Sequence, residues 1–124
     1  MSMEPNPFFQ VEDLGGAVIV LLHADMVTTP HRDLLYEFAD TVKDQAKPYA
    51  VVVDLSPNSQ INSRMIAVLI HLQKRVREAG GTIRFCGIAP QVRKLLDITR
   101  TSALFQIDNN RKDSLAVLGV KPQL

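Results

Sequence analysis

The sequence predicts a single α/β domain with a mixed, mostly parallel sheet, a leading β-hairpin and about four helices. Two observations carry this prediction. Short β-branched runs alternate with stretches whose apolar residues recur at helical spacing, and a Gly-Gly turn separates the first two strand-like runs. Strands that alternate with helices imply right-handed crossovers between parallel strands. The expected order of elements is therefore ββαβαβαβα.

The composition is that of an ordinary globular protein. Hydrophobic residues make up 46% of the 124 residues and charged residues 22%, which suits one domain with a real core. The formal net charge of +1 gives no electrostatic case for binding nucleic acid or an acidic membrane. A single cysteine excludes an intrachain disulfide, and the longest apolar run, 17–22, is too short to cross a bilayer. We expect a cytoplasmic protein without membrane insertion.

The first part of the chain is expected to form a flexible end and a hairpin. Residues 1–7 are polar and contain two prolines, so the domain itself is expected to span 8–120. Strands are predicted at 8–11 and 17–22, on either side of a turn at 13–16 that contains the Gly-Gly pair.

A helix is predicted after this hairpin. Thr29 suits an N-cap and Pro30 the first helical position, and the helix is expected to stop before Pro48.

A buried strand followed by an amphipathic helix organises the middle of the sequence. Ala50 to Val53 is apolar without alternation, as in a strand covered on both faces. From Ser63 to Ala79 the spacing of apolar residues predicts a helix with one broad buried stripe. Asp54 ends the strand and is expected to bond to loop N–H groups. The segment 55–62, which we call the elbow, is a candidate functional site because a helix N-terminus there gathers free N–H groups.

The remaining elements follow the same alternation. In chain order we expect a strand at 82–86, a helix from Pro90, a brief edge strand at 104–107 and a final helix capped by Asp108 or Asn109.

The residue types needed for catalysis or metal binding do not occur at suitable spacings. His23, His31 and His71 lack metal-ligand spacing with one another or with Cys86. The sequence contains neither a nucleophile elbow for Ser/His chemistry nor a phosphate-binding glycine loop. We therefore expect no enzyme activity, no metal and no cofactor.

Five short motifs occur in order from the middle of the chain onward. They are DLS at 54–56, INS at 61–63, GG at 80–81, G-x-x-P-x-V at 87–92 and LF-x-I at 104–107. Together they resemble the STAS family, which is named for sulfate transporters and anti-sigma factor antagonists. The resemblance covers nearly the whole chain.

The resemblance implies a non-enzymatic regulatory protein, similar to an anti-sigma factor antagonist, that binds partners under control of phosphorylation. It implies an anti-sigma factor with a serine kinase domain as one partner and a phosphatase as another. Ser63 matches the family's phosphoacceptor serine, and a phosphate at a helix N-terminus is electrostatically favoured. The residues themselves also allow a plainer interpretation, in which Ser63 or Asn62 is only an N-cap.

The sequence departs from the family pattern around that serine. Asn62 replaces the usual acidic residue, and Arg64 and Met65 replace small residues. Arg64 could pair with a phosphate or obstruct a kinase, and Asp25 resembles the acid expected in the turn after the second strand. We expect Asn62, Arg64 and Asp25 to contact a partner. The departures leave open a structural role, either in a stress-signalling scaffold or as a subunit of a lipid-transport ABC complex. The oligomeric state is also left open.

Overall fold

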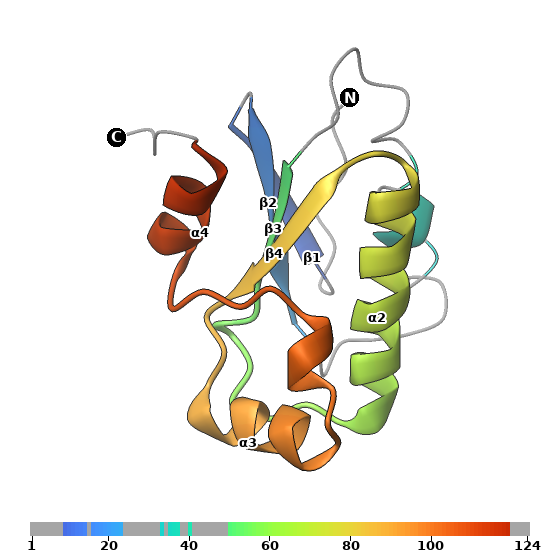
Figure 1. The fold of residues 1–124 in the computed structure, drawn as a ribbon, viewed down its shortest axis with the longest axis vertical. Coiled ribbons are helices and arrows are strands. Elements are labelled where there is room, and N and C mark those ends of the chain that lie inside the picture. Colours follow the sequence, from blue (N-terminus) through green and yellow to red (C-terminus); the bar gives the residue numbers. More distant parts are fainter. Residues whose placement is uncertain are drawn as a thin grey trace.

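A four-stranded sheet forms the centre of the molecule (Figure 1). The computed structural model describes residues 9–14, 16–23, 33, 35–37, 40 and 50–119. The strands, in spatial order, are β1 (Phe9–Asp13), β2 (Ala17–Leu22), β3 (Ala50–Asp54) and β4 (Thr82–Cys86). The β1–β2 pair is antiparallel, whereas β2, β3 and β4 run parallel, so the predicted mixed sheet is confirmed.

The leading hairpin is confirmed with a longer first strand than expected. β1 continues to Asp13 because Glu12 and Asp13 still pair with Ile19 and Val18 of β2. The Leu14 N–H donates to the Ala17 carbonyl at 2.8 Å and closes the turn.

Three α-helices and one short 3-10 helix follow β3 in the described part of the chain. They are α2 (Ser63–Glu78), α3 (Pro90–Ile98), η3 (Ser102–Leu104) and α4 (Arg111–Leu118). The expected helix after Pro30 is helical at the residues described there, 33, 35–37 and 40. Its predicted cap at Thr29, its end before Pro48, and the flexible end 1–7 lie outside the described residues. In this described part, no helix has the length and apolar character needed to cross a membrane.

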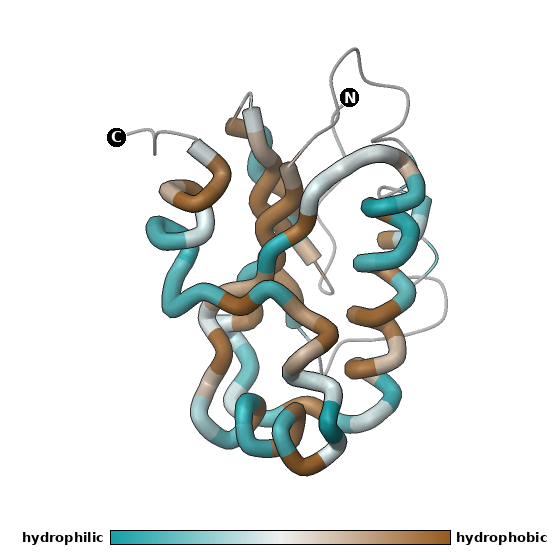
Figure 2. The backbone as a smooth tube through the Cα atoms, in the orientation of Figure 1, coloured by the Kyte–Doolittle hydropathy of each residue, from teal (hydrophilic) through white to brown (hydrophobic). Residues whose placement is uncertain are grey.

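The two faces of the sheet are covered by different helices. α2 packs on one face and α4 on the other (Figure 1). The side chains of Val51 and Val53 join the larger core on the α2 side, and the side chain of Val52 joins a small cluster on the α4 side. The tube coloured by hydropathy shows the same arrangement, with apolar strands in the middle and polar residues along the outer side of α2 (Figure 2).

The buried stripe predicted for α2 is confirmed. Met65, Leu69, Leu72 and Val76 are each at most 1% exposed. On α3, Val92 and Leu96 are buried and Leu95 is half-buried.

Cys86 lies at the end of β4 in the small cluster beneath α4 and is fully buried. This burial is the main reason that the pKa of its thiol rises to about 12.

The edge strand expected at 104–107 is reduced to a single bridge. Leu104 belongs to η3, and Ile107 alone of that segment bridges to Phe85 of β4. The physical reason is that the Leu104 carbonyl accepts from Gln73 Nε2 at 2.8 Å, and the Phe105 ring turns inward against Phe85 at 4.8 Å between centroids. The segment therefore pairs with β4 at one residue instead of forming a strand along it.

The predicted cap of the last helix, Asp108 or Asn109, is wrong by one or two residues. Asn110 is the N-cap, and its side chain accepts from the Asp113 N–H at 2.8 Å. Asp108 is not available for capping because it binds Arg84 at 2.6 and 2.8 Å and Ser114 Oγ at 2.7 Å.

Candidate functional site

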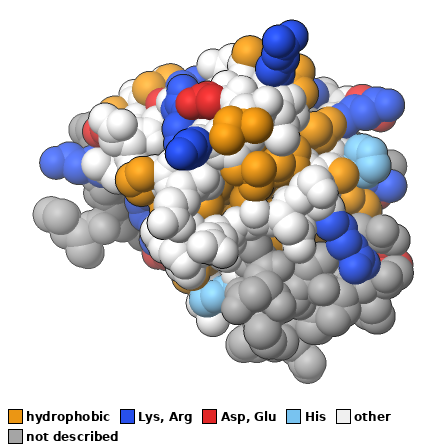
Figure 3. Space-filling view, turned by 90° about the horizontal axis from the view of Figure 1, so that it is seen from below, with side chains coloured by type: hydrophobic (Ala, Val, Ile, Leu, Met, Phe, Trp, Pro, Cys, Tyr) orange, Lys and Arg blue, Asp and Glu red, His pale blue; other side chains and the backbone are white. Residues whose placement is uncertain are grey.

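The elbow lies at the carboxyl end of β3, at the same end of the molecule as α3 (Figure 1). Seen from that end, apolar side chains occupy the middle of the surface and Lys and Arg side chains lie around them (Figure 3). The carboxyl ends of parallel strands meet at one edge of a sheet, which is where such folds commonly place their sites.

Gly87, just after β4, packs directly against the elbow. It has a φ of +69°, and a Cβ added there would lie 2.5 Å from Asp54 Oδ1 and 2.8 Å from Ser56 N. Both the backbone conformation and the space require glycine. The connection from β4 to α3 therefore packs against Asp54 and Ser56 with no room for a side chain at Gly87.

Asp54 fixes the start of the elbow. Its carboxylate accepts from the Ser56 N–H at 2.9 Å, so the expected bond to a loop N–H is confirmed. Arg111 of α4 donates to the other oxygen from Nη2 at 2.8 Å and from Nε at 3.2 Å. Burial raises the pKa of Asp54, but the bonds from Arg111 and Ser56 outweigh it, and the pKa lies below its ordinary value.

The Asp54–Arg111 pair escaped sequence reasoning because its partners lie far apart in the chain. No local motif connects a strand end to a residue of the last helix, and the arginine stands among other surface charges.

Asn58 ties the elbow to the end of β2. Its side chain is buried, and Nδ2 donates to the Leu22 carbonyl at 2.8 Å and to the Leu55 carbonyl at 3.0 Å. The bond to Leu22 places the end of β2 beside the elbow. Asp25, the residue expected to contribute from the turn after β2, lies outside the described residues.

The three remaining predicted site residues are consecutive at the start of α2. Asn62 is the N-cap, and its Oδ1 accepts from the Met65 N–H at 2.9 Å. Ser63 and Arg64 are the first two helical residues, and both are exposed. Within the described part of the chain, neither the Ser63 hydroxyl nor the backbone N–H groups of Ser63 and Arg64 make a hydrogen bond. The structure thus assigns the cap to Asn62 and not to Ser63.

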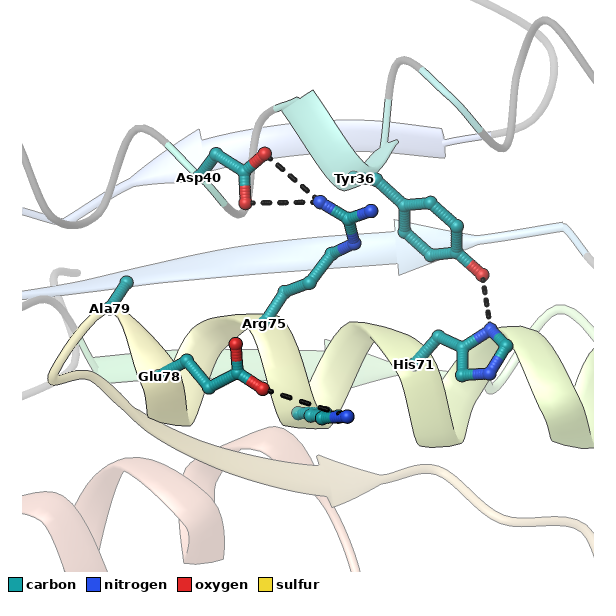
Figure 4. Close-up of a pocket in the computed structure, with 7 residues that line it drawn as sticks. Tyr36, Asp40, His71, Arg75, Glu78 and Ala79 are labelled. Carbon is teal, nitrogen blue, oxygen red and sulfur yellow. Dashed lines mark hydrogen bonds and ion pairs between the residues drawn. The ribbon is translucent and has the colours of Figure 1, made fainter.

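An open groove elsewhere on the described part of the molecule has a volume of about 510 Å³. It lies between α2 and the helical residues Tyr36 and Asp40 (Figure 4). Its charges are already matched, because Arg75 binds Asp40 at 3.1 Å and Lys74 lies 3.8 Å from Glu78. Each Lys, Arg, Asp and Glu side chain among the described residues that line the groove thus has an ion-pair partner, and we place the candidate site at the elbow.

Comparison with known proteins identifies the type of domain. The STAS domain family profile matches residues 9–114. BtrV of Bordetella bronchiseptica, a protein assigned as an anti-sigma factor antagonist, is 24% identical over 106 residues, covering 86% of this chain and 90% of BtrV.

Two solved structures show the same fold. An anti-sigma factor antagonist from Mycobacterium paratuberculosis has 25% identity and a TM-score of 0.69, with 90% of this chain and 92% of that chain covered. A chain of the stressosome, described as a signal integration and transduction hub, has 17% identity and a TM-score of 0.74, with 89% and 96% covered. The profile match spans most of the sequence, and the sheet order and the helix after β3 agree with it: the chain belongs to the STAS domain family.

Proposed function

We propose that this protein is a regulatory antagonist of an anti-sigma factor, and that phosphorylation of Ser63 controls its binding. The observation that carries the proposal is that the N-cap of α2 is Asn62 and not Ser63. Asn62 supplies the cap, and the exposed Ser63 hydroxyl bonds to none of the described residues, so its modification breaks no bond among them. The names of the relatives, anti-sigma factor antagonists among them, support the same function.

The electrostatics at this point favour an added phosphate. A phosphoserine carries roughly −1.5 to −2 charges at neutral pH. The free N–H groups of Ser63 and Arg64 and the positive end of the helix dipole would stabilise that charge. The first turn of α2 contains no acidic residue that would repel it. Modification is therefore expected to leave the fold intact and to change the sign of the exposed surface.

Three residues near the start of α2 and after β2 are proposed to bind the partner. Arg64 is exposed and makes no ion pair within the described residues, so its charge is available to a partner. Asn62 lies beside it, and Asp25 follows β2 in the sequence, where Asn58 of the elbow binds the Leu22 carbonyl. We assign all three to the contact with an anti-sigma factor that carries a serine kinase domain, with a phosphatase to reverse the modification. The role is binding and not catalysis, and the cytoplasm is the expected compartment.

The decisive experiment locates the phosphate. Purified protein is incubated with ATP and the serine kinase encoded nearest to its gene, and mass spectrometry then assigns the modified residue. One phosphate is expected on Ser63, none on Ser63→Ala, and a normal level on Ser59→Ala, which removes another exposed elbow serine.

Binding to the kinase is measured before and after modification. Phosphorylation should weaken it, Ser63→Asp should do so in part because a carboxylate has less charge, and Arg64→Glu should weaken it without lowering the Tm.

Two results would contradict the proposal. Phosphate found on Ser56 or Ser59 instead of Ser63 would refute the assigned site. A stoichiometrically modified Ser63 with unchanged affinity for the kinase would refute the switch.

A further inference from the structure

A second exposed surface lies at the C-terminal end of α3 and is separate from the start of α2. It consists of Lys94, Ile98, Arg100 and Leu104, which we call the α3 surface. We propose that the α3 surface docks an acidic segment of a protein partner, in which carboxylates flank an aliphatic side chain. This inference does not depend on whether Ser63 is phosphorylated.

Arg100 holds a backbone conformation that suits glycine. Its φ is +60°, and it is the one non-glycine residue with positive φ in the described part of the chain. It ends α3 in a left-handed turn, in which the Arg100 N–H donates to the Asp97 carbonyl at 3.1 Å and the Thr101 N–H to the Leu96 carbonyl at 2.8 Å. A side chain makes this conformation less stable than the right-handed one, because its Cβ lies too close to the following carbonyl oxygen.

The other helices show what this position normally requires. α2 is followed by Gly80 with φ +86°, and α4 is capped by Gly119 with φ +74°. Among α2, α3 and α4, only α3 ends in such a turn with an arginine in place of glycine. Glycine would remove the backbone strain at this position. An arginine that is kept there in spite of the strain indicates that its side chain has a role other than stabilising the fold.

Large apolar side chains are exposed on both sides of this arginine. Ile98 is 68% exposed and Leu104 is 48% exposed, and these are two of the three exposed large hydrophobic residues in the described part. The turn at Thr101 brings α3 and η3 into contact, so the two side chains belong to one corner of the molecule. Lys94 lies one helical turn before Ile98 on the same side of α3.

A hydrogen bond from Gln73 holds Leu104 in its exposed position, and making it leaves a buried oxygen of Gln73 unpaired among the described residues. Gln73 of α2 is buried and donates from Nε2 to the Leu104 carbonyl at 2.8 Å, while its Oε1 has no hydrogen-bond partner within the described residues. An unpaired buried oxygen is unfavourable, because it has lost its hydrogen bonds to water without replacing them. The bond fixes η3 against α2, so the corner is preformed.

The charges at this corner determine the kind of partner. Arg93 binds Asp97 at 3.5 Å, which neutralises the carboxylate on α3, whereas Lys94 and Arg100 make no ion pair within the described residues. Two unmatched cations beside two exposed aliphatic side chains complement carboxylates around an apolar side chain. The overall formal charge of +1 does not favour a nucleic acid or an anionic membrane as the occupant.

The test uses the full-length, isotope-labelled protein and a synthetic peptide of repeated Glu-Glu-Leu units. In an NMR titration, amide shifts are expected to concentrate at the α3 surface and to weaken with salt. Arg100→Gly and Ile98→Ala should each raise the peptide Kd by about two- to fivefold, as expected for loss of one exposed contact. The matched controls remove the same groups elsewhere: Arg77→Ala on α2 and Val117→Ala on α4, both exposed, should leave the Kd unchanged.

Stability separates a binding role from a structural one. Arg100→Gly should raise the Tm by roughly 2–5 °C because the strain is released, although it weakens peptide binding. A lower Tm for Arg100→Gly would show that the arginine stabilises the fold, and the proposal would be wrong. It would also be overturned if the shifts are absent, if Val117 shifts as strongly, or if a Lys-Lys-Leu peptide or oligouridine binds the same residues equally well.

Discussion

At the scale of single residues, Gly87 shows how closely the site is fitted. It combines a positive φ with a contact to the elbow on the side where a Cβ would point. Gly119 has nearly the same φ, +74°, but open space around it. The two glycines therefore allow the cost of the backbone conformation to be separated from the cost of the contact.

We expect Gly119→Ala to lower the free energy of unfolding by about 1–2 kcal/mol, the cost of the left-handed conformation. Gly87→Ala should lower it by about 2–5 kcal/mol, because overpacking against Asp54 and Ser56 adds to that cost. Chemical denaturation of both variants provides the measurement. Equal losses would mean that the β4–α3 connection moves away freely and does not constrain the elbow.

At the scale of the elements, the packing of α2 on the sheet holds the candidate site in position. Its N-terminus carries Ser63, while its buried stripe packs on the sheet behind it. The position of the serine therefore depends on apolar contacts that lie one or more turns further along the helix.

Leu69→Ala is expected to destabilise the protein by about 2–5 kcal/mol, since Leu69 is 1% exposed and leaves a cavity in the main core. Val117→Ala removes a similar side chain that is 58% exposed, and it should change stability by less than about 0.5 kcal/mol. Denaturant midpoints measured side by side test the pair. A mild effect at Leu69 would mean that α2 is not anchored as described.

Elements with a strong periodic pattern could be predicted from the sequence, whereas segments whose conformation depends on contacts with residues far away in the sequence could not. The β-branched run of β3 and the apolar stripe of α2 are local patterns that predict a strand and a helix. The segment 104–107 has the same apolar character as a strand, but Gln73 and Phe85 determine its course. The cap of α4 moved to Asn110 because Arg84, far away in sequence, occupies Asp108. At the site, the resemblance identified Ser63, whereas the choice of Asn62 as cap needed coordinates.

At the scale of the whole molecule, ion pairs fasten α4 to the sheet. Asp54 binds Arg111 at 2.8 Å, and Asp108 binds Arg84 at 2.6 Å and Ser114. Hydrogen bonds from Arg84 are the main cause that lowers the pKa of Asp108, against the opposing effect of burial. Both carboxylates therefore titrate at a lower pH in the folded than in the unfolded chain.

The sign of the pH dependence follows. A lowered folded-state pKa gives stability that is fully present above the unfolded value, near pH 4, and is lost as the pH falls through the folded value. The Tm is expected to decrease as the pH is lowered from about 6 to about 3. Asp108→Asn should lower the Tm at neutral pH and flatten this decrease. A wild-type Tm that stays constant over the same range would contradict the assignment.

The buried thiol at the end of β4 makes the molecule unusually simple to label. Cys86 is the single cysteine of the chain, is fully buried and has a pKa raised to about 12, so it presents almost no thiolate to a reagent. A cysteine introduced by Ser59→Cys in the exposed elbow would then be the one thiol that reacts with a maleimide dye. A fluorophore could thus be attached beside the start of α2 without first removing the native cysteine, and partner arrival could be followed in real time.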